Sequence, residues 1–129
     1  MSHSRNQLSA TEQPQPILNE QPAVWQVVIQ DVNEWWSSTN APEVSIRSAL
    51  IQDMTDRDNF GREKYKVPLQ PFNGRDALVD LYQEFLDATV YTRQLLLENP
   101  QTGPFPDLYT TLLRMLVTIR TELYLRDGK

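Results

Sequence analysis

The sequence predicts an all-α fold, a bundle-like arrangement of four antiparallel helices behind a disordered N-terminal leader. Three observations support this prediction. Apolar residues recur at helical spacing in four long segments, breaks rich in proline separate these segments, and no segment is a strong strand candidate. The connections between the segments are short, which favours antiparallel packing of neighbouring helices.

Each element follows from its local composition. Residues 1–21 are rich in Ser, Gln, Asn and Pro, so we expect a flexible leader, followed by a single helical domain over residues 22–129. The third helix has the clearest start, because Asn73 is a favoured N-cap and Asp76 stands three residues later, as in a capping box. The four helices are expected at about 23–37, 43–64, 73–98 and 106–126.

The charge balance limits the classes of ligand. The chain of 129 residues has 17 acidic and 12 basic side chains, which gives a net charge of −5. Contacts to the phosphates of a nucleic-acid polymer need a basic face, so we do not expect a nucleic-acid binder. A small phosphorylated ligand, met by a local cluster of cations, is compatible with this balance.

The residue types also limit the chemistry. The chain has no cysteine, which excludes disulfides, thiolate metal sites and cysteine nucleophiles. Its one histidine, His3, lies in the predicted leader, so we expect neither a histidine-based triad nor a zinc site. No apolar run approaches the roughly 20 residues that span a bilayer, and no signal-peptide core follows Met1. We therefore expect a cytoplasmic protein with no membrane partner.

The third predicted helix carries four carboxylates, and their intervals are four, four and three residues. At about 100° per residue they fall within roughly 80° of one helical face. Stacked like charges destabilise a helix by roughly a few tenths of a kcal/mol per pair. Bulk water around a solvated face, a basic residue of a neighbouring helix or a divalent cation would each offset this repulsion. The carboxylates are Asp76, which fits a capping role better than a metal site, Asp80, Glu84 and Asp87.

A second acidic pair lies on the preceding predicted helix. Asp53 and Asp56 are three residues apart and share a face, as do Glu84 and Asp87. If the two helices pack antiparallel, the four carboxylates can converge, and hard oxygen ligands of this kind suit Mg²⁺ or Mn²⁺. The alternative is that these acids form only solvated faces or salt bridges.

The two acidic pairs resemble the metal-binding pattern of the all-α nucleoside triphosphate pyrophosphohydrolases of the MazG type. That family carries Glu-x-x-Glu on one helix and Glu-x-x-Asp on the next. Asp53 and Asp56 would match the first pair, with the shorter Asp at both Glu positions, and Glu84 and Asp87 would match the second. The resemblance implies a Mg²⁺-dependent hydrolase that cleaves between the α- and β-phosphates. It also implies that the four residues hold the metal and that Glu84 is catalytic.

A second resemblance covers about residues 53–94. It rests on Phe-Gly-Arg-Glu-Lys-Tyr at 60–65, Pro-Leu-Gln at 68–70 and Asn-Gly-Arg-Asp at 73–76. These segments are similar to those of a family of small phage and bacterial proteins. The Gly-Arg-Glu-Lys-Tyr portion at 61–65 further resembles a Gly-x-Lys-Lys-Tyr segment of phage proteins described as dATP/dGTP diphosphohydrolase-like. The similarity implies that the partner is a small-molecule nucleotide.

Polar and basic residues gather around the connector between the second and third predicted helices. Arginine and lysine beside an open helix N-terminus favour phosphate, because free N–H groups and the helix dipole attract anions. The alternative is that the arginines pair with Glu63, Asp76 or Asp80 and only hold the loop. The candidate ligand-binding residues are Arg62, Lys64, Tyr65, Asn73 and Arg75.

The first predicted helix carries Trp25, Trp35 and Trp36, which is more than a small monomer needs to bury. We therefore expect this helix to contribute to a subunit interface and the protein to form a homo-oligomer. Two functions from other classes stay open beside the hydrolase. One is a non-catalytic protein that binds a nucleotide or a nucleotide signal, and the other is a helical protein-interaction module that uses the tryptophans.

Overall fold

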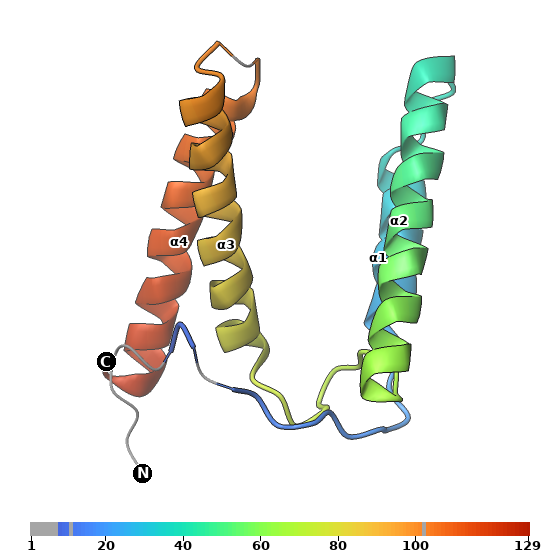
Figure 1. The fold of residues 1–129 in the computed structure, drawn as a ribbon. Coiled ribbons are helices and arrows are strands. Elements are labelled where there is room, and N and C mark those ends of the chain that lie inside the picture. Colours follow the sequence, from blue (N-terminus) through green and yellow to red (C-terminus); the bar gives the residue numbers. More distant parts are fainter. Residues whose placement is uncertain (1–7, 11, 102) are drawn as a thin grey trace. The chain divides into compact units, whose positions relative to one another are not determined.

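The computed structural model describes residues 8–10, 12–101 and 103–129 and confirms the predicted all-α class (Figure 1). These described residues form four helices and no strand. α1 packs against α2, and α3 packs against α4. The helices are α1 (Val24–Trp35), α2 (Ala41–Tyr65), α3 (Ala77–Glu98) and α4 (Phe105–Asp127). Within the described part of the chain, none of them is long and apolar enough to cross a membrane.

The chain divides into two compact units, each built on one helix pair. Residues 14–75 form the α1–α2 unit. The described residues of 76–129, together with those before Pro14, form the α3–α4 unit. The single helical domain expected over residues 22–129 stays a prediction, because its helix pairs belong to different units.

Burial of apolar side chains holds the α3–α4 unit together. Leu123 of α4 is fully buried and forms a core with Ile119, with Val79 of α3 and with Leu8 of the N-terminal segment. Ile119 and Leu123 belong to the apolar pattern that predicted the last helix, whereas Val79 lies outside the apolar face predicted for the third helix. The partly buried residues packed against this core are Leu78, Tyr82 and Phe85.

The third helix begins later than the sequence predicted. Its N-cap is Asp76, whose side chain accepts a hydrogen bond from the Val79 N–H at 3.2 Å, so the predicted N-cap at Asn73 is wrong. Asn73 is buried instead, and its Oδ1 accepts a hydrogen bond from the Arg75 N–H at 3.1 Å. Gly74 follows Asn73 with a φ of 85°, which is a left-handed conformation that glycine tolerates and an α-helix does not contain.

Polar contacts hold the α1–α2 unit, whose described residues include no fully buried apolar side chain. The Gln70 side chain makes three of these contacts. Its Nε2 donates to the carbonyl oxygens of Asn19 and Gln21 at 2.8 Å each, and its Oε1 accepts the Asn19 N–H at 3.1 Å. Gln70 therefore clamps the segment before α1 to the segment after α2. The buried side chains of this unit are Asp58, Gln70 and Asn73.

Part of the predicted flexible leader contacts the rest of its unit. Residues 1–7, which include His3, and residue 11 lie outside the described residues. In the α1–α2 unit, the Ile17 N–H donates to the carbonyl oxygen of Asn73 at 2.8 Å. In the α3–α4 unit, Leu8 is buried in the core. Local composition did not predict these contacts, because each depends on residues far along the chain.

The tryptophans at the first helix differ in exposure. Trp35 is 84% exposed, whereas Trp25 and Trp36 are half-buried. The Arg47 side chain of α2 donates to the carbonyl oxygens of Trp36 and Ser38, which holds the turn between the two helices. The expected role of this helix in a subunit interface stays a prediction.

Candidate functional site

The four carboxylates of the predicted metal site are all exposed. Asp53 and Asp56 lie on α2, and Glu84 and Asp87 lie on α3. Their spacing of three residues places the two members of each pair on one helical face. Asp56 accepts a hydrogen bond from Gln52 Nε2 at 2.9 Å. None of the salt bridges found among the described residues involves these four carboxylates.

The two acidic pairs belong to different units, because α2 lies in the α1–α2 unit and α3 in the α3–α4 unit. Within either unit, the residues that the structure describes include no group of three or more His, Cys, Asp or Glu side chains placed to hold a metal. Each pair by itself supplies two carboxylates. Mg²⁺ commonly takes about one or two carboxylates from a protein and completes its shell with water and substrate phosphates. Convergence of the four carboxylates stays a prediction.

Three of the predicted ligand-binding residues meet in the α1–α2 unit. Lys64 Nζ lies 5.2 Å from the centre of the Tyr65 ring, and the guanidinium carbon of Arg75 lies 5.6 Å from it. Arg75 Nη1 also donates to the carbonyl oxygen of Pro14 at 3.0 Å, which orients this side chain. Two cations beside one aromatic ring combine positive potential with a stacking surface. This combination suits a ligand that carries both phosphate and a ring.

The connector after α2 brings Arg75 back to Tyr65. Lys66 adopts a φ of 68° directly after Tyr65, a left-handed conformation that ends α2. Asn73 shapes the other end of the connector through its bond to the Arg75 N–H. The sequence predicted that these residues would gather here, and the structure shows that Asn73 acts within the turn.

Arg62 has a partner on its own helix. Its Nε forms a salt bridge with Asp58 Oδ1 at 2.9 Å, and Asp58 is buried. The partners expected from the sequence for a structural Arg62 were Glu63, Asp76 and Asp80, and Asp58 was not among them. The spacing of four residues along α2 was the available signal.

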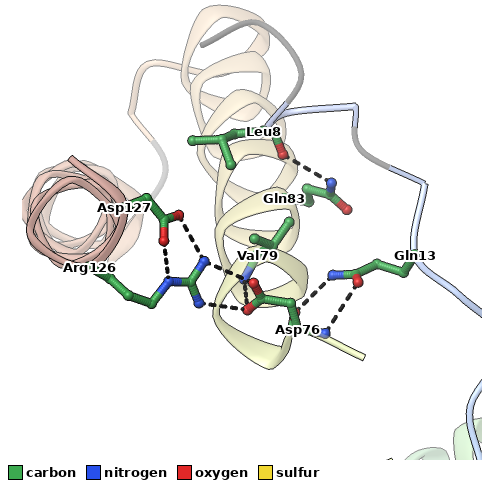
Figure 2. A network of polar contacts seen from close by, with 7 residues as sticks. All are labelled: Leu8, Gln13, Asp76, Val79, Gln83, Arg126 and Asp127. Atoms are coloured by element: carbon green, nitrogen blue, oxygen red, sulfur yellow. Dashed lines mark hydrogen bonds and ion pairs between the residues drawn. The ribbon is translucent and has the colours of Figure 1, made fainter. Parts of the chain in front are cut away.

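Asp76, the N-cap of α3, takes part in a network of polar contacts (Figure 2). Arg126 of α4 forms a bidentate ion pair with it, from Nη2 to Oδ2 at 2.8 Å and from Nη1 to Oδ1 at 3.0 Å. Arg126 Nε also donates to Asp127 Oδ1 at 2.8 Å. The Gln13 side chain donates to the Asp76 carbonyl oxygen at 2.9 Å and accepts the Asp76 N–H at 3.2 Å. Asp76 therefore caps α3, as the sequence favoured over a metal role, but it does so as the N-cap itself and not as the third residue of a capping box.

These contacts shift the pKa values of the three charged groups. Hydrogen bonding from Arg126 is the largest cause that lowers the pKa of Asp76, the Val79 N–H adds to the effect, and partial burial opposes it. Hydrogen bonding from Arg126 also lowers the pKa of Asp127. In return, the hydrogen bond to Asp127, followed by that to Asp76, raises the pKa of Arg126. Neither Arg126 nor Gln13 was predicted as a partner of Asp76, although a basic residue in the last turn of α4 was a signal for a helix-end contact.

Known proteins add no assignment to these residues. The chain matches no protein-family model, no curated protein and no solved structure in the comparisons made with each. The candidate site therefore consists of what the geometry provides, which is two exposed acidic pairs and the cluster of Lys64, Tyr65 and Arg75.

Proposed function

We propose that the protein is a divalent-cation-dependent hydrolase that cleaves a nucleoside triphosphate between the α- and β-phosphates. The observation that carries the proposal is a contrast among the acids. Arginines engage Asp58 and Asp76 in ion pairs. The acidic pairs of α2 and α3 are exposed and stand outside the salt bridges of the described residues. Carboxylates without arginine partners are oxygen donors available to Mg²⁺ or Mn²⁺.

The carboxylates have two proposed roles, which are cation binding and proton transfer. Asp53 and Asp56 would hold a cation on α2, and Glu84 and Asp87 would hold one on α3. A cation bound at such a pair supplies charge that polarises phosphate oxygens and lowers the pKa of a bound water. Glu84 carries the catalytic role, because its exposed carboxylate can accept the proton that an attacking water loses.

The cluster of Lys64, Tyr65 and Arg75 would bind the nucleotide. The two cations would neutralise phosphate charge. The Tyr65 ring can stack on the base. Lys64 and Tyr65 stand on the same helix as Asp53 and Asp56, so one unit contains both the basic cluster and one acidic pair.

The test is release of pyrophosphate from a panel of nucleoside triphosphates, with and without Mg²⁺ or Mn²⁺. We expect cation-dependent release by the wild-type protein. Loss of a catalytic proton acceptor costs roughly 10² to 10⁴ in rate, so Glu84→Gln should lower kcat by at least about a hundredfold. Glu122→Gln is the matched control, because Glu122 is an exposed acid of α4 in the same unit. Unchanged kcat in Glu84→Gln would contradict the assignment.

The basic cluster also favours a second candidate function, a non-catalytic protein that binds a nucleotide. Lys64 and Arg75 both lie beside the Tyr65 ring, and neither contact involves a residue of the acidic pairs. Thermal unfolding with added nucleotide separates the two functions, because a ligand at about 100 times its Kd stabilises a single-site protein by roughly 2.7 kcal/mol. Stabilisation that survives EDTA, without pyrophosphate release, would indicate binding alone. Stabilisation that needs the cation would support the hydrolase.

A further inference from the structure

The exposed side of α2 carries a second pairing of an aromatic ring with a cation. The guanidinium carbon of Arg57 lies 5.4 Å from the centre of the Phe60 ring, and Phe60 is 58% exposed. Tyr65, five residues later, has the corresponding contacts with Lys64 and Arg75. The last part of α2 therefore presents two rings, and each ring lies beside at least one cation.

The two rings point to different sides of the helix. Five residues correspond to about 140° around the axis and about 7.5 Å along it. On a cylinder about 10–12 Å wide, this offset separates the rings by on the order of 13 Å. A single base can therefore stack on only one of the two rings.

The arc between the rings carries two cations and a glycine. Measured around the axis from Phe60, Lys64 lies at about 40° and Arg57 at about 60°. Gly61 lies at about 100°, before Tyr65 is reached at about 140°. Both cations are exposed. We call this part of α2, from Arg57 to Tyr65, the two-ring surface.

Gly61 leaves open space on the two-ring surface. A Cβ atom at this position would meet no heavy atom within 4 Å beyond its chain neighbours and the backbone of its own helix. Glycine inside a helix is unfavourable relative to alanine, so a packing or functional reason is expected for it. Close packing gives no such reason here. An open position beside two cations gives a chain of phosphates room to approach the helix.

The acidic residues of this part of α2 lie outside the two-ring surface. Asp58 is buried, lies about 20° beyond the Tyr65 ring and forms the salt bridge with Arg62. Glu63 lies about 60° from the Phe60 ring, on the side away from the arc. The arc between the rings is therefore positive.

The acidic pair of α2 stands before the two-ring surface along the helix. Asp53 and Asp56 precede Phe60 by seven and four residues, which corresponds to about 10.5 and 6 Å along the axis. A divalent cation bound at this pair would offset its charge toward an anionic ligand.

We infer that the two-ring surface takes a ligand with two bases joined by a chain of phosphates, which is a dinucleoside polyphosphate. One base stacks on each ring, and the linking phosphates cross the arc over Gly61 beside Lys64 and Arg57. Stacking accepts any base, because every base has a π-face. This ligand class rests on the proposed function, because it specifies the ligand of the proposed nucleotide site, but it does not require hydrolysis.

A single-stranded nucleic acid is less suited to this surface. Such a strand follows a basic groove over about four or more nucleotides, whereas α2 offers two rings. The net charge of −5 also disfavours a polymer of phosphates.

Equilibrium binding of two analogues tests the inference. Diadenosine tetraphosphate and ATP, both as methylene-bridged analogues that resist hydrolysis, are compared by isothermal titration calorimetry in Mg²⁺. We expect the Kd of the two-base analogue to be lower at least about tenfold, because its second base binds intramolecularly once the first is stacked. Equal Kd values, or no binding of either analogue, would overturn the inference. Tighter binding of a short single-stranded oligodeoxyadenylate would overturn it as well.

Substitutions at the first ring locate the second base. Phe60→Ala should raise the Kd of the two-base analogue to about that of the ATP analogue, whose own Kd stays unchanged because its base stacks on Tyr65. Phe60→Trp keeps a ring and should keep the difference. Ile46→Ala is the matched control and should change neither Kd, because Ile46 is 56% exposed on the same helix, far from both rings. Equal effects of Phe60→Ala on both Kd values would overturn the inference.

A substitution at the glycine tests the path of the phosphates. Gly61→Gln fills the open position with an uncharged side chain that favours a helix, so the Tm should not fall. We expect the Kd of the two-base analogue to rise at least about tenfold. Ala49→Gln is the control, because it places the same side chain at an exposed position of α2. A wild-type Kd in Gly61→Gln would overturn the placement of the phosphates.

The pyrophosphate-release assay separates this inference from the proposed function. Tighter binding of the two-base analogue without pyrophosphate release from any nucleoside triphosphate would contradict the hydrolase and support the two-ring surface. Cation-dependent release with equal Kd values for the two analogues would support the hydrolase and overturn the two-ring surface.

Discussion

The two units of this chain are held together by different interactions. An apolar core around Leu123 and an ion pair between Asp76 and Arg126 hold the α3–α4 unit. Polar side chains, above all Gln70 and Asn73, hold the α1–α2 unit. Apolar burial depends on volume and is not directional, whereas a buried polar group depends on one particular partner. The two units should therefore respond to different substitutions.

Removing apolar volume should have the largest effect, and it should appear in the α3–α4 unit. Leu123→Ala leaves a cavity at the fully buried core position, and we expect a loss of about 2–5 kcal/mol in the free energy of unfolding. Amide hydrogen exchange, read separately for α3–α4 and α1–α2, should show lost protection in the first pair. Leu125→Ala, at a 70% exposed position of the same helix, should change stability by less than about 0.5 kcal/mol. Equal loss of protection in both helix pairs would contradict the expectation that the two units respond to different substitutions.

Removing a polar clamp should have a smaller effect, and it should appear in the α1–α2 unit. Gln70→Ala leaves the backbone groups of Asn19 and Gln21 without their partner, and we expect a loss of about 1–3 kcal/mol. Faster exchange of the Asn19 amide proton is the specific readout. Gln52→Ala is the control, because Gln52 is exposed and its side chain only bonds Asp56 on the helix surface. A Gln70→Ala variant with wild-type exchange at Asn19 would show that the clamp does not hold this segment.

The ion pair should give the smallest effect and a defined pH dependence. The pKa of Asp76 is lower in the folded protein than its usual value of 3.8, so the unfolded chain binds more protons than the folded chain in acid. The stabilisation is therefore complete above the unfolded pKa and is lost as the pH falls through the folded pKa. Urea unfolding between neutral and strongly acidic pH measures this loss.

Two substitutions separate the cap from the ion pair. Asp76→Ala removes both and should cost about 1 kcal/mol at neutral pH, because an N-cap side chain contributes about that much. Asp76→Asn keeps a capping oxygen and removes the charge, so we expect a loss of only a few tenths of a kcal/mol, as for an exposed ion pair. Both variants should show a weaker pH dependence in acid than the wild-type protein. If the free energy of unfolding of Asp76→Asn fell in acid as steeply as that of the wild-type protein, another group would cause the pH dependence.

The candidate site was predictable from the sequence only in part. Lys64 and Tyr65 are neighbours at the end of a predicted helix, so their proximity followed from the sequence alone. Arg75 reaches the same ring because the connector returns, and turn conformations at Lys66 and Gly74 guide that return. Both Asn73 and Asp76 have the chemistry of an N-cap. The turn decided between them, because the Asn73 side chain was already used within it.

By itself, the sequence determined the all-α class, the approximate positions of the four helices and the acidic pairs they carry. Helical periodicity, proline breaks and capping chemistry act over a few residues, so one chain is enough to read them. The tertiary structure decided which helices pair, which acids arginines engage and which apolar stripes stay exposed. These outcomes depend on the rotation of each helix about its axis and on contacts between distant segments, such as Arg126 with Asp76 and Gln70 with Asn19. Local spacing does not specify either.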